Sequence, residues 1–186
     1  MRLLLVFTTL LLLSSELFAN NRERLQEANF AATHTLNQNN LERKNQSVLT
    51  YLWVDVYAAA FYAPAQASAS QALAKPLTQR LELYYFRNID SQDVIKAAWV
   101  TLERQHDATT LAPLRSQIDD LHATFRDIRP GDRYALNLTV GAGLTLEVNG
   151  KVAYTSQDPA LAKAYLGIWL APNGLSDKLR TSLLAD

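Results

Sequence analysis

Strand-forming residues dominate the chain between residues 48 and 86. From Val48 through Tyr57 to Pro64 the residues are mostly aromatic, β-branched or small and apolar, which predicts either two strands or one long bent strand. The stretch 80–86 alternates polar and apolar residues in its first half, as a half-buried strand does. These segments predict the first part of a sheet.

Alternation of apolar and polar residues returns in the second half of the chain. Tyr134 to Val140 and Leu144 to Val148 have apolar residues at every second position, and residues 151–154 are expected to pair back. Gly141 to Gly143 form a turn, and Asn149-Gly150 is a strong hairpin signal because both residues tolerate positive φ. The pattern predicts a three-stranded antiparallel meander.

Apolar residues at steps of three and four predict helices on both sides of this meander. We expect one helix to begin at Asp90, whose carboxylate would accept free backbone N–H groups, and a second to cover 111–128. A third helix begins at Asp158, directly before a proline, and Ser176 caps a short last helix. The apolar side of the third helix consists of Leu161, Ala164, Tyr165, Ile168 and Trp169.

The order of these elements decides the fold class. Strands, two helices, a meander and two more helices predict an α+β domain, in which helices cover one face of an antiparallel sheet. No internal repeat and no second domain is visible, so residues 20–186 are predicted to form a single domain.

The N-terminus has the features of an export signal. Arg2 precedes an apolar run from Leu3 to Leu13, and a small residue, Ala19, follows at the position of a cleavage site. The run is too short to span a hydrocarbon core of roughly 30 Å. We interpret residues 1–19 as a signal peptide, with an uncleaved anchor as the alternative, and we expect the mature chain to have no membrane span.

Composition excludes several function classes. Lys plus Arg and Asp plus Glu are both 18, and no basic cluster suits nucleic acid. The chain has no cysteine, and therefore no disulfide or thiolate chemistry. His34, His106 and His122 lack partners at metal-ligand spacing, so we interpret them as surface histidines and expect no metal. No serine lies in a Gly-x-Ser-x-Gly turn, and Gly141 to Gly143 lack the helix of a dinucleotide site, so no catalytic residue and no cofactor is predicted. A monomer is the default.

Tyrosine and tryptophan gather in the strand region and are the main candidates for ligand contact. Each has an apolar body and a polar tip that needs a partner when buried. Most are expected in the core, but a few could line a cleft between sheet and helices. They are Tyr51, Trp53, Tyr57, Tyr62, Tyr84 and Tyr85.

An ordered set of segments resembles the bacterial branch of the chalcone-isomerase-like proteins. The segments are Tyr51 to Pro64, Leu81 to Ile89, Pro130 to Tyr134, Leu146 to Lys151 and Leu166 to Pro172. The resemblance implies an open-faced β-sandwich, whose ligand cleft lies between the sheet and a helical layer. Together with the export signal it implies a periplasmic location.

The family includes plant isomerases that close chalcones to flavanones and related plant proteins that bind fatty acids without catalysis. Ring closure needs cationic and hydroxyl donors at the developing enolate, so the resemblance implies an arginine and a tyrosine in an isomerase cleft. In this chain Thr50 stands where that arginine is expected, and Arg43 or Lys44 could supply the charge instead. Tyr57 matches the tyrosine that contacts the carboxylate in fatty-acid-binding members.

Other positions of the resemblance also favour binding over catalysis. The isomerases place tyrosine, lysine and asparagine at the start of the helix after Phe86, where this chain has Ser91, Gln92, Asp93 and Lys96. Arg87 matches a family feature, although a salt bridge to Asp90 or Asp93 would also explain it.

The sequence therefore predicts a binder of a fatty acid or similarly shaped apolar carboxylate, with no catalytic residue. Tyr57 is the first candidate contact, followed by Thr50, Arg43 and Arg87. Two alternatives remain. An isomerase or other intramolecular lyase would need a buried cation beside Tyr57, whereas a structural envelope protein would fill the cleft with its own side chains.

Overall fold

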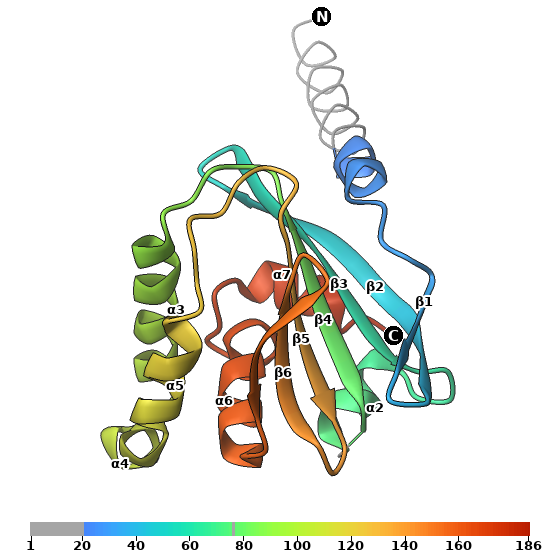
Figure 1. Cartoon of the computed structure of the whole chain (residues 1–186). Helices are drawn as coiled ribbons and strands as arrows, with labels where there is room; N and C mark the ends of the chain where they lie inside the picture. Colours follow the sequence, from blue (N-terminus) through green and yellow to red (C-terminus); the bar gives the residue numbers. More distant parts are fainter. Residues whose placement is uncertain (1–20, 76) are drawn as a thin grey trace, which may run out of the picture.

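A computed structural model describes residues 21–75 and 77–186 of the chain. The predicted signal peptide, residues 1–19, lies outside these residues. The described part begins with a helical segment, residues 21–28, and continues into a sheet with a helical layer (Figure 1). No helix in these two ranges is long and apolar enough to cross a membrane.

The sheet has seven strands, and each pairs antiparallel with the next along the chain. Short turns join β1 to β2, β2 to β3, β5 to β6 and β6 to β7, whereas helices lie between β3 and β4 and between β4 and β5. The strands are β1 (Thr33–Leu36), β2 (Asn39–Tyr51), β3 (Val54–Pro64), β4 (Gln79–Tyr85), β5 (Arg133–Thr139), β6 (Gly143–Val148) and β7 (Lys151–Ser156).

Helices cover one face of this sheet, with α3, α5 and α6 side by side in Figure 1. The helices are α2 (Ala69–Ala74), α3 (Ser91–Gln105), α4 (Ala108–Leu111), a 3₁₀ turn (Ala112–Leu114), α5 (Arg115–His122), α6 (Pro159–Leu170) and α7 (Asp177–Leu183). The predicted α+β class, with an antiparallel sheet and a helical layer on one face, is confirmed.

Strand β3 has buried side chains on both faces of the sheet. Tyr57 and Phe61 point to the helices and belong to the main core, while Ala58 and Tyr62 point to the opposite face. On that face Phe30 and its neighbours ahead of β1 cover part of the sheet. Because both faces of β3 are buried, its sequence from Val56 to Pro64 is apolar rather than alternating.

Several predicted boundaries are confirmed in detail. Asn149 and Gly150 have φ values of 50° and 76°, as a tight hairpin turn requires. Asp158 accepts hydrogen bonds from the backbone N–H groups of Ala160 and Leu161, and Ser176 accepts one from Leu179. Side-chain acceptors of this kind satisfy the free donors at helix starts.

The predicted cap of α3 by the Asp90 side chain is wrong. Asp90 occupies the cap position, but its side chain makes no capping hydrogen bond. Instead Asp127 Oδ1 accepts both the backbone N–H and the hydroxyl of Ser91, each at 3.0 Å. The cap comes from a residue distant in sequence, which local spacing does not reveal.

The single helix predicted over residues 111–128 is also wrong. Helix α5 ends at His122, and the apolar spacing continues into an extended segment in which Ile128 pairs with Ile89. Their backbone groups exchange hydrogen bonds of 2.9 and 3.0 Å. Pro113, in the 3₁₀ turn, also separates α4 from α5.

Candidate functional site: a cleft between sheet and helices

A cavity of about 370 Å³ lies between the sheet and the helical layer, and we call it the cleft. Strands β2 to β4, helices α3 and α6, and the segment before α7 contribute to it. The lining residues are Leu49, Thr50, Tyr51, Val56, Tyr57, Tyr85, Ile89, Asp93, Val94, Ala97, Ala98, Tyr165, Ile168, Trp169, Leu175 and Ser176.

The cleft has an exposed mouth and a buried floor. Tyr51 and Leu175 are exposed at the mouth, where Asp93 also lies. Tyr57, Tyr85 and the α6 aromatic residues at the floor are buried. A site with this gradient admits a molecule from solvent at one end and removes its apolar part from water at the other.

Tyr57 and Trp169 form the polar centre of the floor. The indole Nε1–H of Trp169 donates to the Tyr57 hydroxyl at 3.0 Å, because an indole nitrogen can only donate. Burial raises the pKa of Tyr57, so the phenol stays protonated. The oxygen already accepts a hydrogen bond, and the O–H hydrogen is left for an acceptor on a bound molecule.

A second hydroxyl at the floor is coupled to a buried histidine. Tyr165 Oη lies 3.1 Å from His122 Nε2. Burial lowers the pKa of His122 to about 4, so the ring is neutral at pH 7. His122 Nδ1 has no partner in the described part of the chain. The proton therefore belongs on Nε2, which donates to Tyr165, since a buried N–H without an acceptor is rarer in proteins than a buried acceptor without a donor.

The expectation that all three histidines are surface residues is wrong for His122. Its exposed fraction is 4%, and it packs against Trp99 and Phe125 with ring centroids 5.8 and 5.5 Å away. The sequence indicated burial for the apolar residues of this helix, and a histidine beside them was not expected to join the core.

Among residues 21–75 and 77–186, no Arg, Lys or His side chain lines the cleft, and the only acidic residue that does is Asp93, at the mouth. An ionised group held deep in the cleft would lack a compensating charge, and burying such a group without one is costly. The donors available at the floor are the neutral hydroxyl groups of Tyr57 and Tyr165.

Thr50 lies in the lining of the cleft, but its hydroxyl is already used in a hydrogen bond within the protein. Thr50 Oγ1 donates to Asp55 Oδ1 at 2.8 Å, and Asp55 also accepts from Arg24 Nε at 3.2 Å. Thr50 therefore brings its methyl group and backbone to the mouth of the cleft, while its hydroxyl fixes the β2–β3 connection.

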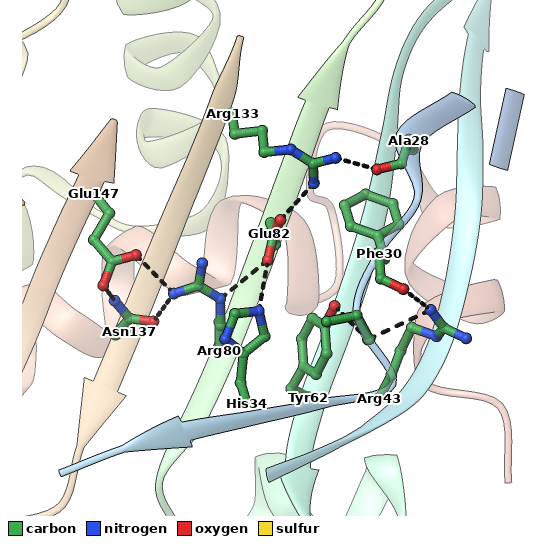
Figure 2. Close-up of polar contacts among 11 residues, drawn as sticks. Ala28, Phe30, His34, Arg43, Tyr62, Arg80, Glu82, Arg133, Asn137 and Glu147 are labelled. Carbon is green, nitrogen blue, oxygen red and sulfur yellow. Dashed lines mark hydrogen bonds and ion pairs between the residues drawn. The ribbon is translucent and has the colours of Figure 1, made fainter. Parts of the chain in front are cut away.

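Arg43 lies on the opposite face of the sheet, so a molecule in the cleft does not reach it. Figure 2 shows its guanidinium beside Tyr62, where it donates to the main-chain oxygen atoms of Phe30 and Ala31. The cause is a bulge in β2. Arg43 pairs with Tyr62 while Asn45 pairs with the next residue, Phe61, so the alternation of faces shifts between them.

Arg87 also lies outside the lining. Its Nε donates to the main-chain oxygen of Asp55 at 3.4 Å, rather than pairing with Asp90 or Asp93. Of the four predicted contact residues, the structure thus brings Tyr57 and Thr50 into one cleft.

The main residues that the sequence analysis missed are Trp169 and Tyr165. Both were assigned to the apolar side of the third predicted helix. Both line the cleft, and their polar atoms contact Tyr57 and His122. A usable signal existed, since a buried indole N–H must find an acceptor.

The opposite face of the sheet carries a second hollow, about 270 Å³ in volume, with charged walls. Figure 2 shows Arg80 between Glu82 and Glu147, with Arg133 on the other side of Glu82. Two arginines face two glutamates here, and Arg133 also donates to the main-chain oxygen of Ala28. These charges satisfy one another and attach the N-terminal segment to the sheet.

Comparisons with known proteins agree with the fold. No curated protein matches the sequence. The solved structure of a fatty-acid binding protein of Arabidopsis thaliana is similar, with a TM-score of 0.59 and 13% identity, covering 83% of this chain and 90% of the plant protein. The profile of the "Chalcone isomerase-like" family matches residues 22–185, which is nearly all of the described chain. The chain belongs to the chalcone isomerase-like family.

Proposed function

We propose that this protein binds a fatty acid or a similarly shaped apolar carboxylate in the cleft, and that it does so without catalysis. The observation that carries the proposal is an apolar cavity of about 370 Å³, open at one end, with a protonated tyrosine hydroxyl at its floor. Small-molecule sites typically measure roughly 300–1,000 Å³, so the cleft suits a ligand of moderate size.

The energy of binding would come mainly from the apolar chain of the ligand. Burial contributes about 0.8 kcal/mol per methylene group, and the walls include Leu49, Val94 and Ile168. The Tyr57 hydroxyl would then orient the polar end by donating to its carbonyl oxygen. Because none of the described lining residues is a cation, the carboxyl group at the floor is bound as the neutral acid.

The absence of a lining cation supports binding over ring closure. An isomerase of the chalcone type needs charge stabilisation of the enolate, which the neutral donors Tyr57 and Tyr165 supply only weakly. The similarity in fold to a plant fatty-acid binding protein points in the same direction. A purely structural role would predict a cleft filled by side chains, and the cavity argues against that role.

The proposal places the protein in the periplasm. Arg2, the apolar run Leu3–Leu13 and Ala19 support export with removal of residues 1–19. N-terminal sequencing of the protein recovered from the periplasmic fraction tests this part. A chain that begins at Met1 and stays in the cytoplasm would contradict it.

The test of binding is a calorimetric titration of delipidated protein with decanoic acid. We expect Tyr57→Phe to weaken binding about fivefold, because one hydrogen bond to the ligand contributes roughly 1 kcal/mol. Tyr62→Phe is the matched control: Tyr62 is buried in the same strand but faces the other side, where its hydroxyl donates to Ala31.

Three results would contradict parts of this proposal. A wild-type protein that binds no fatty acid of any chain length would remove the binding function. Equal losses in Tyr57→Phe and Tyr62→Phe would show that Tyr57 acts through stability alone. Turnover of a chalcone that falls in Tyr57→Phe while ligand retention is unchanged would favour the isomerase.

A further inference from the structure

The connection between β2 and β3 presents apolar side chains to solvent, and we call residues 51–54 the hairpin tip. The exposed fractions are 66% for Tyr51, 72% for Leu52, 95% for Trp53 and 40% for Val54. None of the four is charged. Large apolar residues gathered on one exposed tip mark an interaction site more often than a chance feature.

The backbone of the tip is unfavourable for the residues that occupy it. Leu52 and Trp53 have φ values of 47° and 68°, in the left-handed region that glycine and asparagine adopt readily. A two-residue hairpin turn of this form normally carries Asn-Gly. The turn would be more stable with other residues than with the leucine and tryptophan that occupy it. These two side chains therefore serve a purpose other than the stability of the fold.

The hairpin tip adjoins the mouth of the cleft. Tyr51 belongs to both, and Leu175, 36% exposed, lies across the mouth. Figure 1 shows the β2–β3 turn at the end of the sheet from which the chain enters α3. A surface that takes up the tip would thus also face the opening of the cleft.

We propose that the hairpin tip docks on a lipid bilayer and holds the mouth of the cleft against it, so that an apolar ligand passes between bilayer and cleft. The docking is inferred from the hairpin tip alone, whereas the transfer of ligand rests on the proposed function. Tyrosine and tryptophan settle at membrane interfaces, where one end of the ring system is apolar and the other wet.

The shape of the tip favours a bilayer over a protein partner. A stable protein interface buries about 800 Å² on each side, which four residues on a narrow turn do not provide. Insertion among lipid headgroups needs only the side chains themselves. Arg87 lies at the base of the turn, hydrogen-bonded to Asp55, where a cation would face lipid phosphate groups.

The N-terminal end of the described chain lies on the same side. Arg24, in the helical segment 21–28, donates to Asp55 next to the tip. The helical segment 21–28 therefore lies beside the base of the hairpin tip.

The test is co-sedimentation of the exported protein with phosphatidylcholine vesicles. The variant Leu52→Asn/Trp53→Gly installs the standard turn residues, so it should fold at least as well as the wild type, which thermal unfolding verifies. We expect its vesicle partitioning to fall at least tenfold, because two apolar side chains no longer leave water. Val140→Ser, which removes a 58% exposed side chain from the turn between β5 and β6, should partition as the wild type does.

Each outcome decides a separate claim. Wild-type protein that stays in solution, or a tip variant that sediments equally well, overturns the docking. A tip-dependent dimer without vesicle binding also overturns it, in favour of a second copy as partner. If both proteins bind decanoic acid in solution but only the wild type extracts it from vesicles, ligand transfer at the tip is supported. Vesicle binding without any binding of decanoic acid would keep the docking and remove the ligand.

Discussion

At the residue scale, the cleft depends on hydroxyl groups that are fixed by neighbouring rings. Trp169 sets the Tyr57 hydroxyl, and His122 sets that of Tyr165. Burial raises the pKa of both tyrosines, so both act as neutral donors at pH 7. Under the proposed function, such a floor would bind a carbonyl or carboxylic acid group beside a long apolar chain.

The low pKa of His122 predicts that the stability of the protein falls as the pH is lowered. The folded-state pKa of about 4 lies below the ordinary value of 6.5, so the unfolded chain takes up a proton first as the pH falls. The buried neutral ring makes its full contribution to the free energy of unfolding above pH 6.5. This contribution falls by up to about 3 kcal/mol as the pH drops towards 4. Chemical denaturation at pH 7 and pH 4.5 should show a smaller loss for His122→Gln than for the wild type.

A matched variant isolates this effect from other titrating groups. His106→Gln changes a histidine outside the core and should keep the pH dependence of the wild type. Identical losses of unfolding free energy in the wild type and His122→Gln would show that the buried ring contributes nothing to it.

The sequence allowed Tyr57 and Thr50 to be placed at the site, but not Arg43. All three were proposed from the family resemblance, and the face on which each lies depends on alternation along its strand, which holds for Tyr57 in β3. In β2 the bulge after Arg43 breaks the alternation, and nothing in the local residues announces it. Contacts such as that between Trp169 and Tyr57 join residues far apart in the chain, so residue type alone suggested only that each needed a partner.

At the scale of elements, hairpins and helix starts followed from local chemistry, whereas tertiary contacts decided the rest. Asn149-Gly150 and Asp158 carry their own turn and cap chemistry and were predictable. The β2–β3 turn at Leu52 and Trp53 has no turn residue, so the sequence left one bent strand or two strands open. Pairing of β2 with β3 over their length overrides the local preference.

Helix α3 offers a direct comparison of a local with a distant cap. Asp127→Ala removes the acceptor of both Ser91 hydrogen bonds and should lower the melting temperature. Asp90→Ala, at the cap position, removes a side chain without a capping hydrogen bond and should have a smaller effect. Thermal unfolding of both variants at pH 7 measures the difference, and a larger effect of Asp90→Ala would restore the prediction made from sequence.

At the scale of the whole molecule, the cleft lies between the sheet and the helical layer. The main core joins most of the sheet to α3, α5 and α6, yet leaves about 370 Å³ open between them. The opposite face, closed by ion pairs and the N-terminal segment, has no comparable apolar opening among the described residues. One end of the molecule thus carries the cleft mouth and the hairpin tip together.

The most direct test of the central claim is native mass spectrometry of the protein from the periplasm, before and after addition of fatty acid, for wild type and Ala98→Phe. Ala98 lines the cleft on α3, so a phenyl ring there fills the cavity. Val100→Phe adds the same ring to an exposed position of the same helix. We expect one fatty-acid mass on the wild type and on Val100→Phe, and none on a folded Ala98→Phe. An empty wild type that ignores added fatty acids, or an equally loaded Ala98→Phe, would contradict binding in the cleft.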